Sequence, residues 1–399
     1  MREKKAKWTV MVYMAGDNNL DSASLRDISE MAKVGSSRKV NILVQLDRGK
    51  DLLTRRFYIT EGGGYEKDLV ETFAETNTGD PKVLENFVLW AIEKYPARRY
   101  FLILWNHEGG WWENGSRQWS VVSRQKKPRN IFWMNSQPET RNSQPERSIA
   151  YDDTSRDALD NRELKEVLSR ISKKIGKKID LLGMDACLMQ MVEVAYQLKD
   201  CVEIMVGSEE EEPFDGWPYD KILQVIKKRP RSWPATIAKR IVREYIKSYE
   251  KKNKNVTQSA INLRKIEKVT EKIDALAKEL ISFLDDAGVF RAITYSRRKS
   301  PRFFRDNYLD LYQFARNLKI RCEKESIKEK AQELISSLRP GRTKAILYQR
   351  HSGEKVKQTH GISIYFPSSW FNPAYKNLDF AKDLSWGRFL EKYLGNSSS

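Results

Sequence analysis

The chain has 399 residues, of which 40% are hydrophobic, and it carries a net charge of +18. This composition excludes a disordered or fibrous protein, and the length suffices for one large domain or two to three smaller ones. No apolar run reaches the roughly 18 residues that a membrane-spanning helix requires. Three cysteines are too few for a disulfide-stapled scaffold. The positive charge suits acidic partners such as nucleic acids. The sequence has, however, no phosphate-binding glycine loop and no RNA-binding aromatic motif. We therefore favour the interpretation that the charge belongs to a solvated surface of lysine and arginine side chains.

The first residues superficially resemble a signal peptide. Residues 2–7 are rich in lysine and arginine, and residues 8–15 are apolar. The apolar stretch is short, however, and it runs directly into a turn-forming sequence that begins at Gly16. We therefore interpret residues 8–15 as a first buried strand, expect no export signal and favour a cytoplasmic location.

Strand and helix patterns alternate through the first half of the chain. Apolar runs typical of buried strands occupy residues 8–15, 40–46, 56–60, 100–105, 179–184 and 204–206. Helical patterns lie between several of these runs, at residues 20–34, 81–94, 161–175 and 188–198. This alternation predicts an α/β fold in which helices cover both sides of a mostly parallel sheet.

The second half of the chain has a different character, because long charged segments with helical periodicity dominate residues 231–338. The expected elements are helices at 233–251, 261–285 and 379–394 and a pair of strands at 344–349 and 361–366. We therefore divide the chain into a sheet-forming domain, residues 1–230, and a helical and strand-bearing region, residues 231–399, that packs on it.

Residues 114–147 fit neither pattern. They are polar, basic and aperiodic, and the sequence Asn-Ser-Gln-Pro-Glu occurs twice, at 135–139 and 142–146. A segment of this composition buries too little apolar surface to order itself, so we predict a flexible insert. Long irregular loops inside compact domains are usually functional or disordered.

Two of the apolar runs end in residues that are capable of nucleophilic chemistry. Residues 100–105 lead to His107, and residues 179–184 lead to Cys187. The carboxyl ends of parallel strands share one edge of the sheet, where reactive groups gather. If the two strands are neighbours, the imidazole can take the thiol proton and later protonate a leaving amine. The other histidines and cysteines carry weaker signals of catalysis: His351, His360, Cys201 and Cys322.

Acidic residues lie near Cys187 in the expected fold. Asp185 precedes it by two positions, and the segment 208–217, with four consecutive glutamates, follows the next strand and so reaches the same edge. A carboxylate in a pocket attracts a guanidinium or ammonium group strongly. The same composition also fits a solvated loop or a calcium site, although it matches no EF-hand spacing, and no metal ligands are assigned.

These residues resemble the nucleophile region of the clostripain family of cysteine peptidases. The likeness begins with residues 180–189, Asp-Leu-Leu-Gly-Met-Asp-Ala-Cys-Leu-Met. It extends to residues 14–20, 79–81, 105–107, 150–154, 208–217 and 360–367, and so covers nearly the whole chain. The resemblance implies a caspase-like αβα sandwich with a mostly parallel central sheet and a dyad of His107 and Cys187. It also implies that Asp185 and Asp215 shape a pocket for an arginine or lysine before the cleaved bond.

The resemblance further implies a maturation step and allows for a cofactor. Family members are often cut between the histidine and the cysteine, and each copy of the repeat is closed by an arginine, Arg141 or Arg147. We therefore predict self-cleavage after Arg141 or Arg147, with residues 114–147 as a processing linker. Clostripain itself needs calcium, so calcium is allowed for here, although the thiol chemistry requires no cofactor.

Three positions depart from the family's pattern, and each has lost a glycine. Glu108 follows the histidine, Gln190 lies three residues after the cysteine, and Phe214 follows the proline of the acidic segment. The expected donors to the oxyanion are backbone amides near Glu108 and Gly109 and at Cys187, and Glu108 suits this role only if its backbone needs no positive φ. The absence of these three glycines points to a specialised or tightly gated enzyme.

The sequence therefore predicts a cysteine endopeptidase that cleaves protein or peptide substrates after arginine or lysine through a thioester. Two alternatives remain. One is a catalytically weak scaffold with a peptidase fold, motivated by the lost glycines. The other is a basic nucleic-acid-associated protein, motivated by the charge of +18. No membrane partner is expected.

Overall fold

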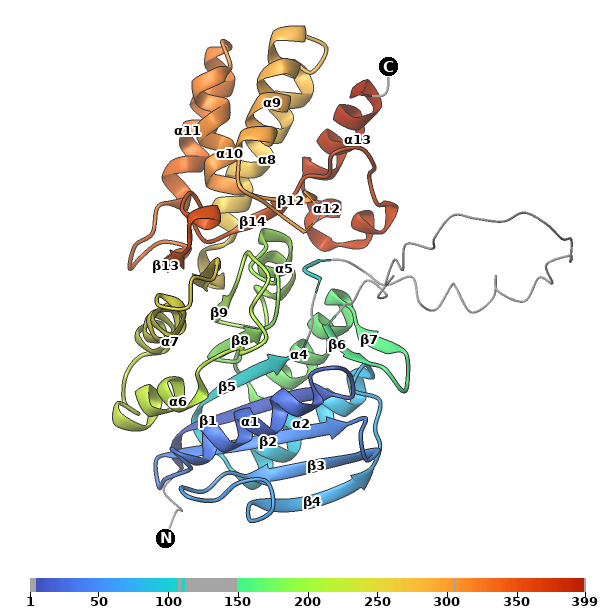
Figure 1. Ribbon diagram of the computed structural model, residues 1–399. Coiled ribbons are helices and arrows are strands. Elements are labelled where there is room, and N and C mark those ends of the chain that lie inside the picture. Colours follow the sequence, from blue (N-terminus) through green and yellow to red (C-terminus); the bar gives the residue numbers. More distant parts are fainter. Residues whose placement is uncertain (1–4, 107–108, 112–148, 305, 398–399) are drawn as a thin grey trace, which may run out of the picture.

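The computed structural model describes residues 5–106, 109–111, 149–304 and 306–397. Among these residues the centre of the molecule is a nine-stranded sheet in the order β13-β10-β9-β8-β5-β1-β2-β3-β4 (Figure 1). Its strands are β1 (Ala6–Gly16), β2 (Val40–Arg48), β3 (Leu53–Tyr58), β4 (Leu69–Ala74), β5 (Ala97–Trp105), β8 (Leu181–Asp185), β9 (Ile204–Gly207), β10 (Val256–Asn262) and β13 (Ile346–Ser352). The five central strands β9, β8, β5, β1 and β2 are parallel. β3 is antiparallel to β2 and β4, and β10 is antiparallel to β9 and β13.

The sheet is covered on both faces because its strands are apolar on both faces. In β1, Met11 and Tyr13 join one hydrophobic cluster, whereas Val10 and Val12 join the other. Successive side chains of a strand point to opposite faces, so one strand feeds two cores. The helices on the first face are α2 (Pro81–Lys94), α4 (Asn161–Ile175) and α5 (Val192–Leu198), and those on the second are α1 (Asp21–Ala32), α6 (Tyr219–Lys228) and α7 (Pro234–Tyr249). The αβα sandwich expected from the sequence is confirmed.

Local sequence signals define where the helices begin and end. The Asp80 carboxylate accepts from Lys82 N at the start of α2, and Pro81 occupies the first turn, where its missing N–H costs nothing. α4 begins with a capping box between Asp160 and Glu163 and ends at Gly176, whose φ of 70° is left-handed.

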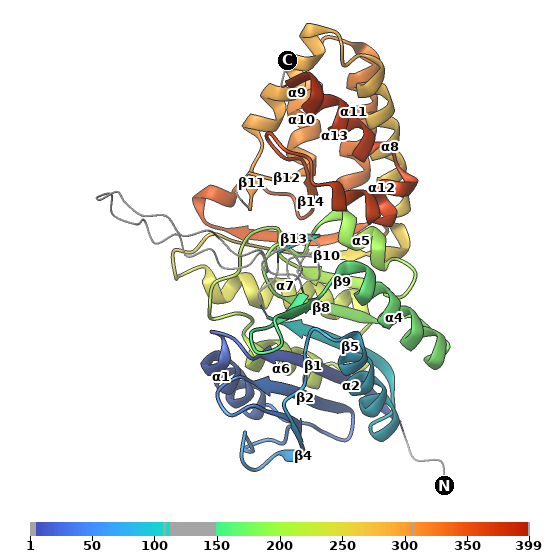
Figure 2. The same ribbon diagram turned by 90° about the vertical axis from the view of Figure 1, so that its right-hand side faces the viewer.

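Residues beyond 230 complete the central sheet and also form a helical layer. β10 and β13 extend the sheet past β9, and α7 packs on them. The regions 1–230 and 231–399 therefore share one continuous sheet. The helical layer lies beyond this edge of the sheet (Figures 1 and 2) and consists of α8 (Glu267–Ser282), α9 (Ala287–Lys299), α10 (Leu311–Arg321), α11 (Glu325–Leu338), α12 (Asp379–Asp383) and α13 (Trp386–Ser397). No helix in the described part of the chain combines the length and apolarity that crossing a membrane requires.

Three expectations for the second half were wrong. The proposed strand pair does not exist, because β13 pairs with β10 while β14 (Ser363–Tyr365) pairs with β12 (Tyr308–Asp310) in a separate small sheet. The helix expected at 261–285 begins only at Glu267, after β10. The closing helix is two helices, α12 and α13. Short apolar runs look alike whether they form strands or buried helical turns, and sequence pattern says nothing about which strands are partners.

Candidate active site

The proposed catalytic residues follow two strands that are neighbours in the sheet. β5 and β8 pair in parallel, with Trp105 opposite Asp185 in the register. The pairing continues one residue further, because Asn106 N donates to Asp185 O at 3.4 Å. His107 and Glu108 lie outside the described residues. Cys187 is described, and it lies two residues beyond the end of β8 at the carboxyl edge of the sheet.

Cys187 occupies a tight turn between β8 and α5. The residue after it, Leu188, has a φ of 65°, a left-handed conformation that a branched side chain adopts only at a cost of about 1–2 kcal/mol. Leu188 N donates to Glu210 O at 3.3 Å, and its side chain is buried, which holds the strained turn in place. The Cys187 side chain is partly exposed, and Glu212 N donates to its Sγ at 3.2 Å. This hydrogen bond favours the thiolate, whereas the donation from Sγ to Glu212 O at 3.9 Å is available only to the thiol.

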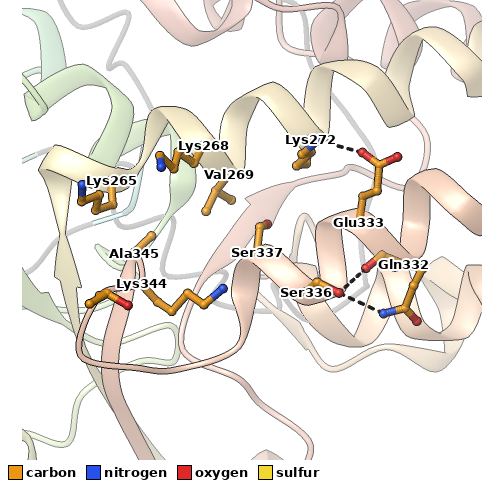
Figure 3. A pocket seen from close by; sticks show the side chains of 11 residues that line it. Lys265, Lys268, Val269, Lys272, Gln332, Glu333, Ser336, Ser337, Lys344 and Ala345 are labelled. Atoms are coloured by element: carbon orange, nitrogen blue, oxygen red, sulfur yellow. Dashed lines mark hydrogen bonds and ion pairs between the residues drawn. The ribbon is translucent and has the colours of Figure 1, made fainter.

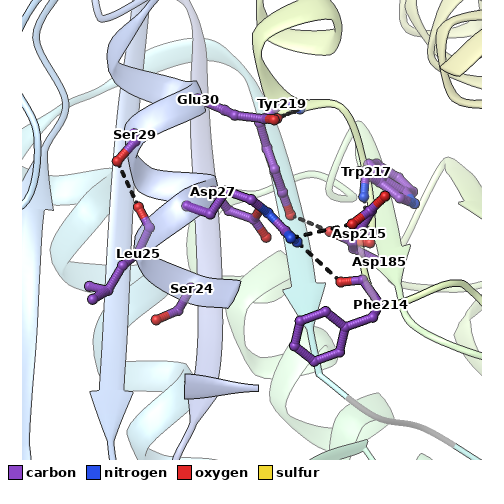
Figure 4. Close-up of polar contacts among 12 residues, drawn as sticks. Ser24, Leu25, Asp27, Ser29, Glu30, Asp185, Phe214, Asp215, Trp217 and Tyr219 are labelled. Atoms are coloured by element: carbon purple, nitrogen blue, oxygen red, sulfur yellow. Dashed lines mark hydrogen bonds and ion pairs between the residues drawn. The ribbon is translucent and has the colours of Figure 1, made fainter. Parts of the chain in front are cut away.

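Asp185 is buried directly beneath the segment that carries Glu212. Its Oδ1 accepts from Trp217 N at 3.1 Å and its Oδ2 accepts from Tyr219 OH at 2.7 Å (Figure 4). Burial raises the pKa of Asp185 to about 7, although the hydrogen bonds from Tyr219, Glu212 and Trp217 oppose that rise. The carboxyl is therefore close to its titration point at neutral pH.

Glu212 is a member of the site that the sequence did not single out. Its carboxyl group faces that of Asp185, and burial and the Asp185 charge together hold the pKa of Glu212 well above its usual range. Gln258 Nε2 donates to its Oε1 at 3.3 Å. Two carboxyl groups in such proximity share a proton, so the pair carries at most one negative charge near neutrality. The only sequence signal was the run of four glutamates, which does not say which of them turns inward.

Asp215 is more exposed than expected for a pocket residue, at 53% of its side-chain surface, and it is already ion-paired. Arg26 on α1 approaches Asp215 Oδ1 at 3.3 Å and also donates to Phe214 O at 3.1 Å. Lys252 Nζ contacts the other oxygen of Asp215 at 2.8 Å. The guanidinium of Arg26 thus lies beside Asp27, whose carboxylate is 3.5 Å away. Figure 4 shows how Asp27 on α1 faces the Phe214–Trp217 segment and Asp185.

Comparison with known proteins identifies the family. The sequence profile of the clostripain family matches residues 12–133 and 130–393. The chain belongs to the clostripain family. Clostripain from Hathewaya histolytica is 26% identical over 434 residues, which cover 92% of this chain and 76% of clostripain. This clostripain-family member is a cysteine-type endopeptidase that acts on protein or peptide substrates.

Solved structures agree in fold. An inactive zymogen C11 protease from Parabacteroides distasonis has a TM-score of 0.69 at 20% identity, over 96% of this chain and 99% of that one. A secreted C11 cysteine protease from Bacteroides thetaiotaomicron, in complex with an irreversible peptide inhibitor, has a TM-score of 0.63 at 20% identity, over 97% of this chain and 99% of that one. At this identity the likeness shows the caspase-like fold.

Two of the positions that lost a glycine have defined roles in the structure. Gln190 is buried, and its Nε2 donates to the backbone carbonyl and the hydroxyl of Ser259, at 3.0 and 2.7 Å. These hydrogen bonds join the turn that carries Cys187 to β10. Phe214 is 53% exposed, and its ring packs against the Arg26 guanidinium at 5.8 Å.

Of the proposed oxyanion donors, Gly109 and Cys187 are described. Gly109 O accepts from Tyr308 OH at 2.6 Å, which anchors the strand-end turn to β12. Gly110, with a φ of 78°, packs so closely that a Cβ there would lie 2.7 Å from Met191 Sδ. Both contacts hold the end of this turn against the body of the protein. Arg141 and Arg147, the proposed self-cleavage positions, lie outside the described residues.

The remaining cysteines and histidines are apart from this site. All three cysteines lie in the described part of the chain, and they form no disulfide. Cys201 is buried, and burial raises the pKa of its thiol to about 12, which makes it a poor nucleophile. His360 lies 3.2 Å from Asp310 and stacks on Tyr312. Burial is the main cause that lowers the pKa of His351.

Two other features bear on ligands. Four carboxylates, Asp17, Asp47, Glu75 and Asp152, have oxygens within 4.8 Å of one another, a set suited to a metal ion. A pocket of about 440 Å³ between α8, α11 and β13 is lined by Lys265, Lys268, Lys272 and Lys344, among others (Figure 3). Lys272 is paired there with Glu333 at 2.8 Å. None of the residues that line this pocket belongs to the candidate active site.

Proposed function

We propose that this clostripain-family endopeptidase cleaves after arginine or lysine through a dyad of His107 and Cys187. The observation that carries the proposal is the register of β5 and β8, in which Trp105 pairs with Asp185. Each proposed catalytic residue lies two positions beyond a member of that pair, and both strands end at the same edge of the sheet. A thiol and an imidazole in this relation are the groups that a cysteine peptidase requires.

In the proposed reaction His107 removes the proton of the Cys187 thiol, and the thiolate attacks the carbonyl carbon of the scissile bond. The C–N bond then breaks, His107 gives its proton to the leaving amine, and the acyl group remains on sulfur as a thioester. A water molecule, deprotonated by His107, attacks the thioester carbon. The C–S bond breaks, the acid leaves and the thiolate is regenerated. Backbone amides near Glu108 and Gly109 and at Cys187 are the proposed donors to the oxyanion.

A basic residue before the cleaved bond is supported by the charges next to Cys187. Asp185 is buried beneath the segment that contacts the sulfur, and Asp215 lies at the exposed end of the same segment. Arg26 already holds its guanidinium against Asp215 and the Phe214 carbonyl. These groups therefore suit a guanidinium, and a substrate arginine would compete with Arg26 for them.

Self-processing is the second part of the proposal. Residues 114–147 offer several basic residues in a polar sequence, and Arg141 and Arg147 are followed by the small polar residues Asn142 and Ser148. Peptidases cut extended, accessible chain more readily than packed helices. An enzyme with this specificity is therefore expected to cut its own insert after Arg141 or Arg147.

The test compares the wild type with Cys187→Ala and His107→Ala, and with Cys201→Ala as a matched control. Both dyad variants are expected to lose more than about 10³-fold in kcat/KM on an arginyl substrate while they keep the wild-type fold by circular dichroism. Cys201→Ala is expected to keep the activity. An arginyl chloromethyl ketone is expected to add its mass to Cys187 in the wild type and in Cys201→Ala, and to add no mass to either dyad variant.

The same preparations report on processing. New N-termini at Asn142 or Ser148 are expected in the wild type after incubation and not in Cys187→Ala. A wild type that stays intact and yet turns over arginyl substrates at full rate would show that processing is not required. A wild type that neither reacts with the inhibitor nor cleaves any arginyl substrate would contradict the proposed specificity and favour a scaffold.

A further inference from the structure

The lysine-lined pocket between α8, α11 and β13 lies apart from the candidate active site. It is a cavity of about 440 Å³, bounded by the start of α8, the end of α11 and the turn that precedes β13. The buried apolar side chains of Val269 and Ala345 form part of its wall. Cavities of a few hundred Å³ that combine apolar walls with a few converging polar groups are typical of small-molecule sites. The volume therefore suits an organic ligand better than a single ion.

The four lysines of this pocket come from three separate segments. Lys265 ends the short helix η1 (Leu263–Lys265), Lys268 lies in the first turn of α8, and Lys272 lies one turn further along. Lys344 belongs to the turn before β13. Figure 3 shows Lys265 and Lys268 beside α8, with Lys344 facing them from that turn. Residues far apart in the chain thus bring like charges to one cavity.

Three of these lysines have no counter-charge in the part of the chain that the structure describes. Lys272 is paired with Glu333 on α11, at 2.8 Å. No carboxylate among the described residues forms an ion pair with Lys265, Lys268 or Lys344, and no group there accepts a hydrogen bond from their ammonium nitrogens. The pocket therefore offers three ammonium groups that are available to an anionic ligand.

The position of the lysines on α8 is electrostatically unfavourable for the protein alone. Lys268 and Lys272 are four positions apart, and like charges at this spacing on a helix repel each other. The first turn of a helix favours negative side chains, and no side chain caps the start of α8. Glu267 is the acidic residue of that turn, and Lys199 lies 3.7 Å from its carboxylate. An anion bound between the lysines would remove this repulsion.

The wall that carries Lys344 is fixed by backbone hydrogen bonds. Lys344 N donates to Gly341 O at 3.1 Å, and Gly341 N donates to Ile346 O at 2.9 Å, so the turn is closed on itself. Asn262 N donates to Ala345 O at 2.8 Å, which attaches the turn to the end of β10. A ligand therefore meets a backbone that is already ordered, and binding does not incur the entropy cost of ordering it.

We propose that this pocket binds an organic anion with two or more phosphate groups, held by Lys265, Lys268 and Lys344. A phosphate monoester carries a charge of about −1.5 to −2 at pH 7, and lysine binds phosphate as a point charge. Several adjacent phosphates therefore match three converging ammonium groups, and the apolar wall accepts the rest of the molecule. A nucleic acid would instead require positive charge along an extended groove.

Binding is tested on full-length Cys187→Ala in phosphate-free buffer with about 0.15 M salt, so that the result does not depend on the proposed peptidase function. The probes are inorganic tripolyphosphate and adenosine triphosphate. Each is expected to show one site by calorimetry and to raise the Tm as its concentration increases. No heat and no Tm shift with either probe would overturn the proposal. Binding of tripolyphosphate without binding of adenosine triphosphate would contradict an organic ligand.

Three single variants locate the site. Lys268→Gln and Lys344→Gln are each expected to weaken binding at least about 10-fold, because each removes one charged hydrogen bond to phosphate. The control is Lys278→Gln, which removes a positive charge from the same helix outside the pocket, where Lys278 is paired with Asp274. This control is expected to bind within about twofold of the parent. Equal weakening in all three variants would show general attraction to a basic surface and overturn the proposal.

The sign of the stability change separates a ligand-binding lysine from a structural one. Without a phosphate probe, Lys268→Gln is expected to match or exceed the parent in Tm, because a repelling charge has been removed. With saturating tripolyphosphate the order is expected to reverse. Lysines that only complement the negative end of the α11 dipole would behave differently. A Lys268→Gln and a Lys344→Gln variant that are less stable than the parent by the same margin under both conditions would contradict a binding site.

A macromolecular ligand is the remaining alternative. Single-stranded RNA and polyglutamate are titrated into the parent and the three lysine variants at the same ionic strength. Both are expected to bind more weakly than adenosine triphosphate and to respond to Lys278→Gln as much as to Lys268→Gln, as surface attraction does. Tighter binding of either polymer, weakened by Lys268→Gln and Lys344→Gln but not by Lys278→Gln, would assign the pocket to a macromolecule and contradict the proposed small polyphosphate.

Discussion

At the scale of single residues, the proposed recognition of a basic substrate depends on the charge of the Asp185–Glu212 pair. The pKa of Asp185 is raised to about 7, chiefly by burial, and burial together with the Asp185 charge holds the pKa of Glu212 well above its usual range. A carboxyl with a raised pKa stays neutral below that value, so Asp185 gains its negative charge as the pH rises through about 7. Attraction for a cationic side chain grows over the same interval.

We therefore expect the preference for arginine over its neutral analogue citrulline to increase between pH 6 and pH 8. The measurement is the ratio of kcat/KM for matched arginyl and citrullyl substrates, because protonation of the dyad affects both and cancels in the ratio. In Asp185→Asn the ratio is expected to be smaller and nearly independent of pH. A wild-type ratio that does not change with pH would show that Asp185 does not titrate in the free enzyme.

Arg26 illustrates why single residues of the site escape sequence analysis. It lies on α1, more than 150 positions before Asp185, and the segment around it carries no motif. The fold places its guanidinium against Asp215 only because α1 packs beside α6 and the chain leading into it. Contacts of this kind depend on tertiary packing, which local pattern does not encode.

At the scale of elements, α4 is a helix whose two ends are defined by identifiable residues. Asp160 caps its N-terminus through Arg162 N and Glu163 N, and Gly176 ends it in a left-handed conformation with no atom near enough to obstruct a Cβ. Asp160→Ala is expected to lower the free energy of unfolding by about 1 kcal/mol through loss of the cap. Gly176→Ala is expected to cost about 1 kcal/mol through left-handed strain alone.

The measurement is urea unfolding of both variants in a Cys187→Ala background. Glu166→Ala, an exposed change in the middle of the same helix, serves as the control and is expected to stay within about 0.5 kcal/mol. The two losses are expected to add in the double variant, because the sites lie about 24 Å apart along the helix. A Gly176→Ala variant as stable as its parent would mean that the helix end relaxes into a right-handed conformation.

At the scale of the whole molecule, the central sheet joins the two halves of the chain. β9 pairs with β10 from Ser259 to Asn262, and β10 pairs in turn with β13. Gln190 and Glu193 reinforce the connection, because Gln190 donates to Ser259 and Glu193 accepts from Tyr365 N and Tyr375 OH. The part up to residue 230 therefore lacks the strand that covers β9.

A chain cut short after residue 230 is consequently expected not to fold as a stable monomer. β9 would become an unpaired edge, and the apolar surface that α7 covers would be exposed, both of which promote aggregation. Size-exclusion chromatography and near-ultraviolet circular dichroism of this fragment, beside full-length Cys187→Ala, test the expectation. A monomeric fragment with a native-like near-ultraviolet spectrum would show that residues 1–230 form an independent domain.

The sequence by itself determined the features that depend on neighbouring positions and on the periodicity of apolar residues. Apolar runs revealed the parallel strands, and the two strand ends that lead to His107 and Cys187 pointed to the dyad, because alternation and turn residues are properties of neighbouring positions. Only the tertiary structure decided that β5 and β8 are neighbours, that β13 joins β10 instead of β14, and that Glu212 faces Asp185. It also brought Asp17, Asp47, Glu75 and Asp152 together from four separate segments. Contacts between such distant residues depend on the packing of the whole chain. The free-energy cost of burying like charges can be assessed only when the distances between them are known.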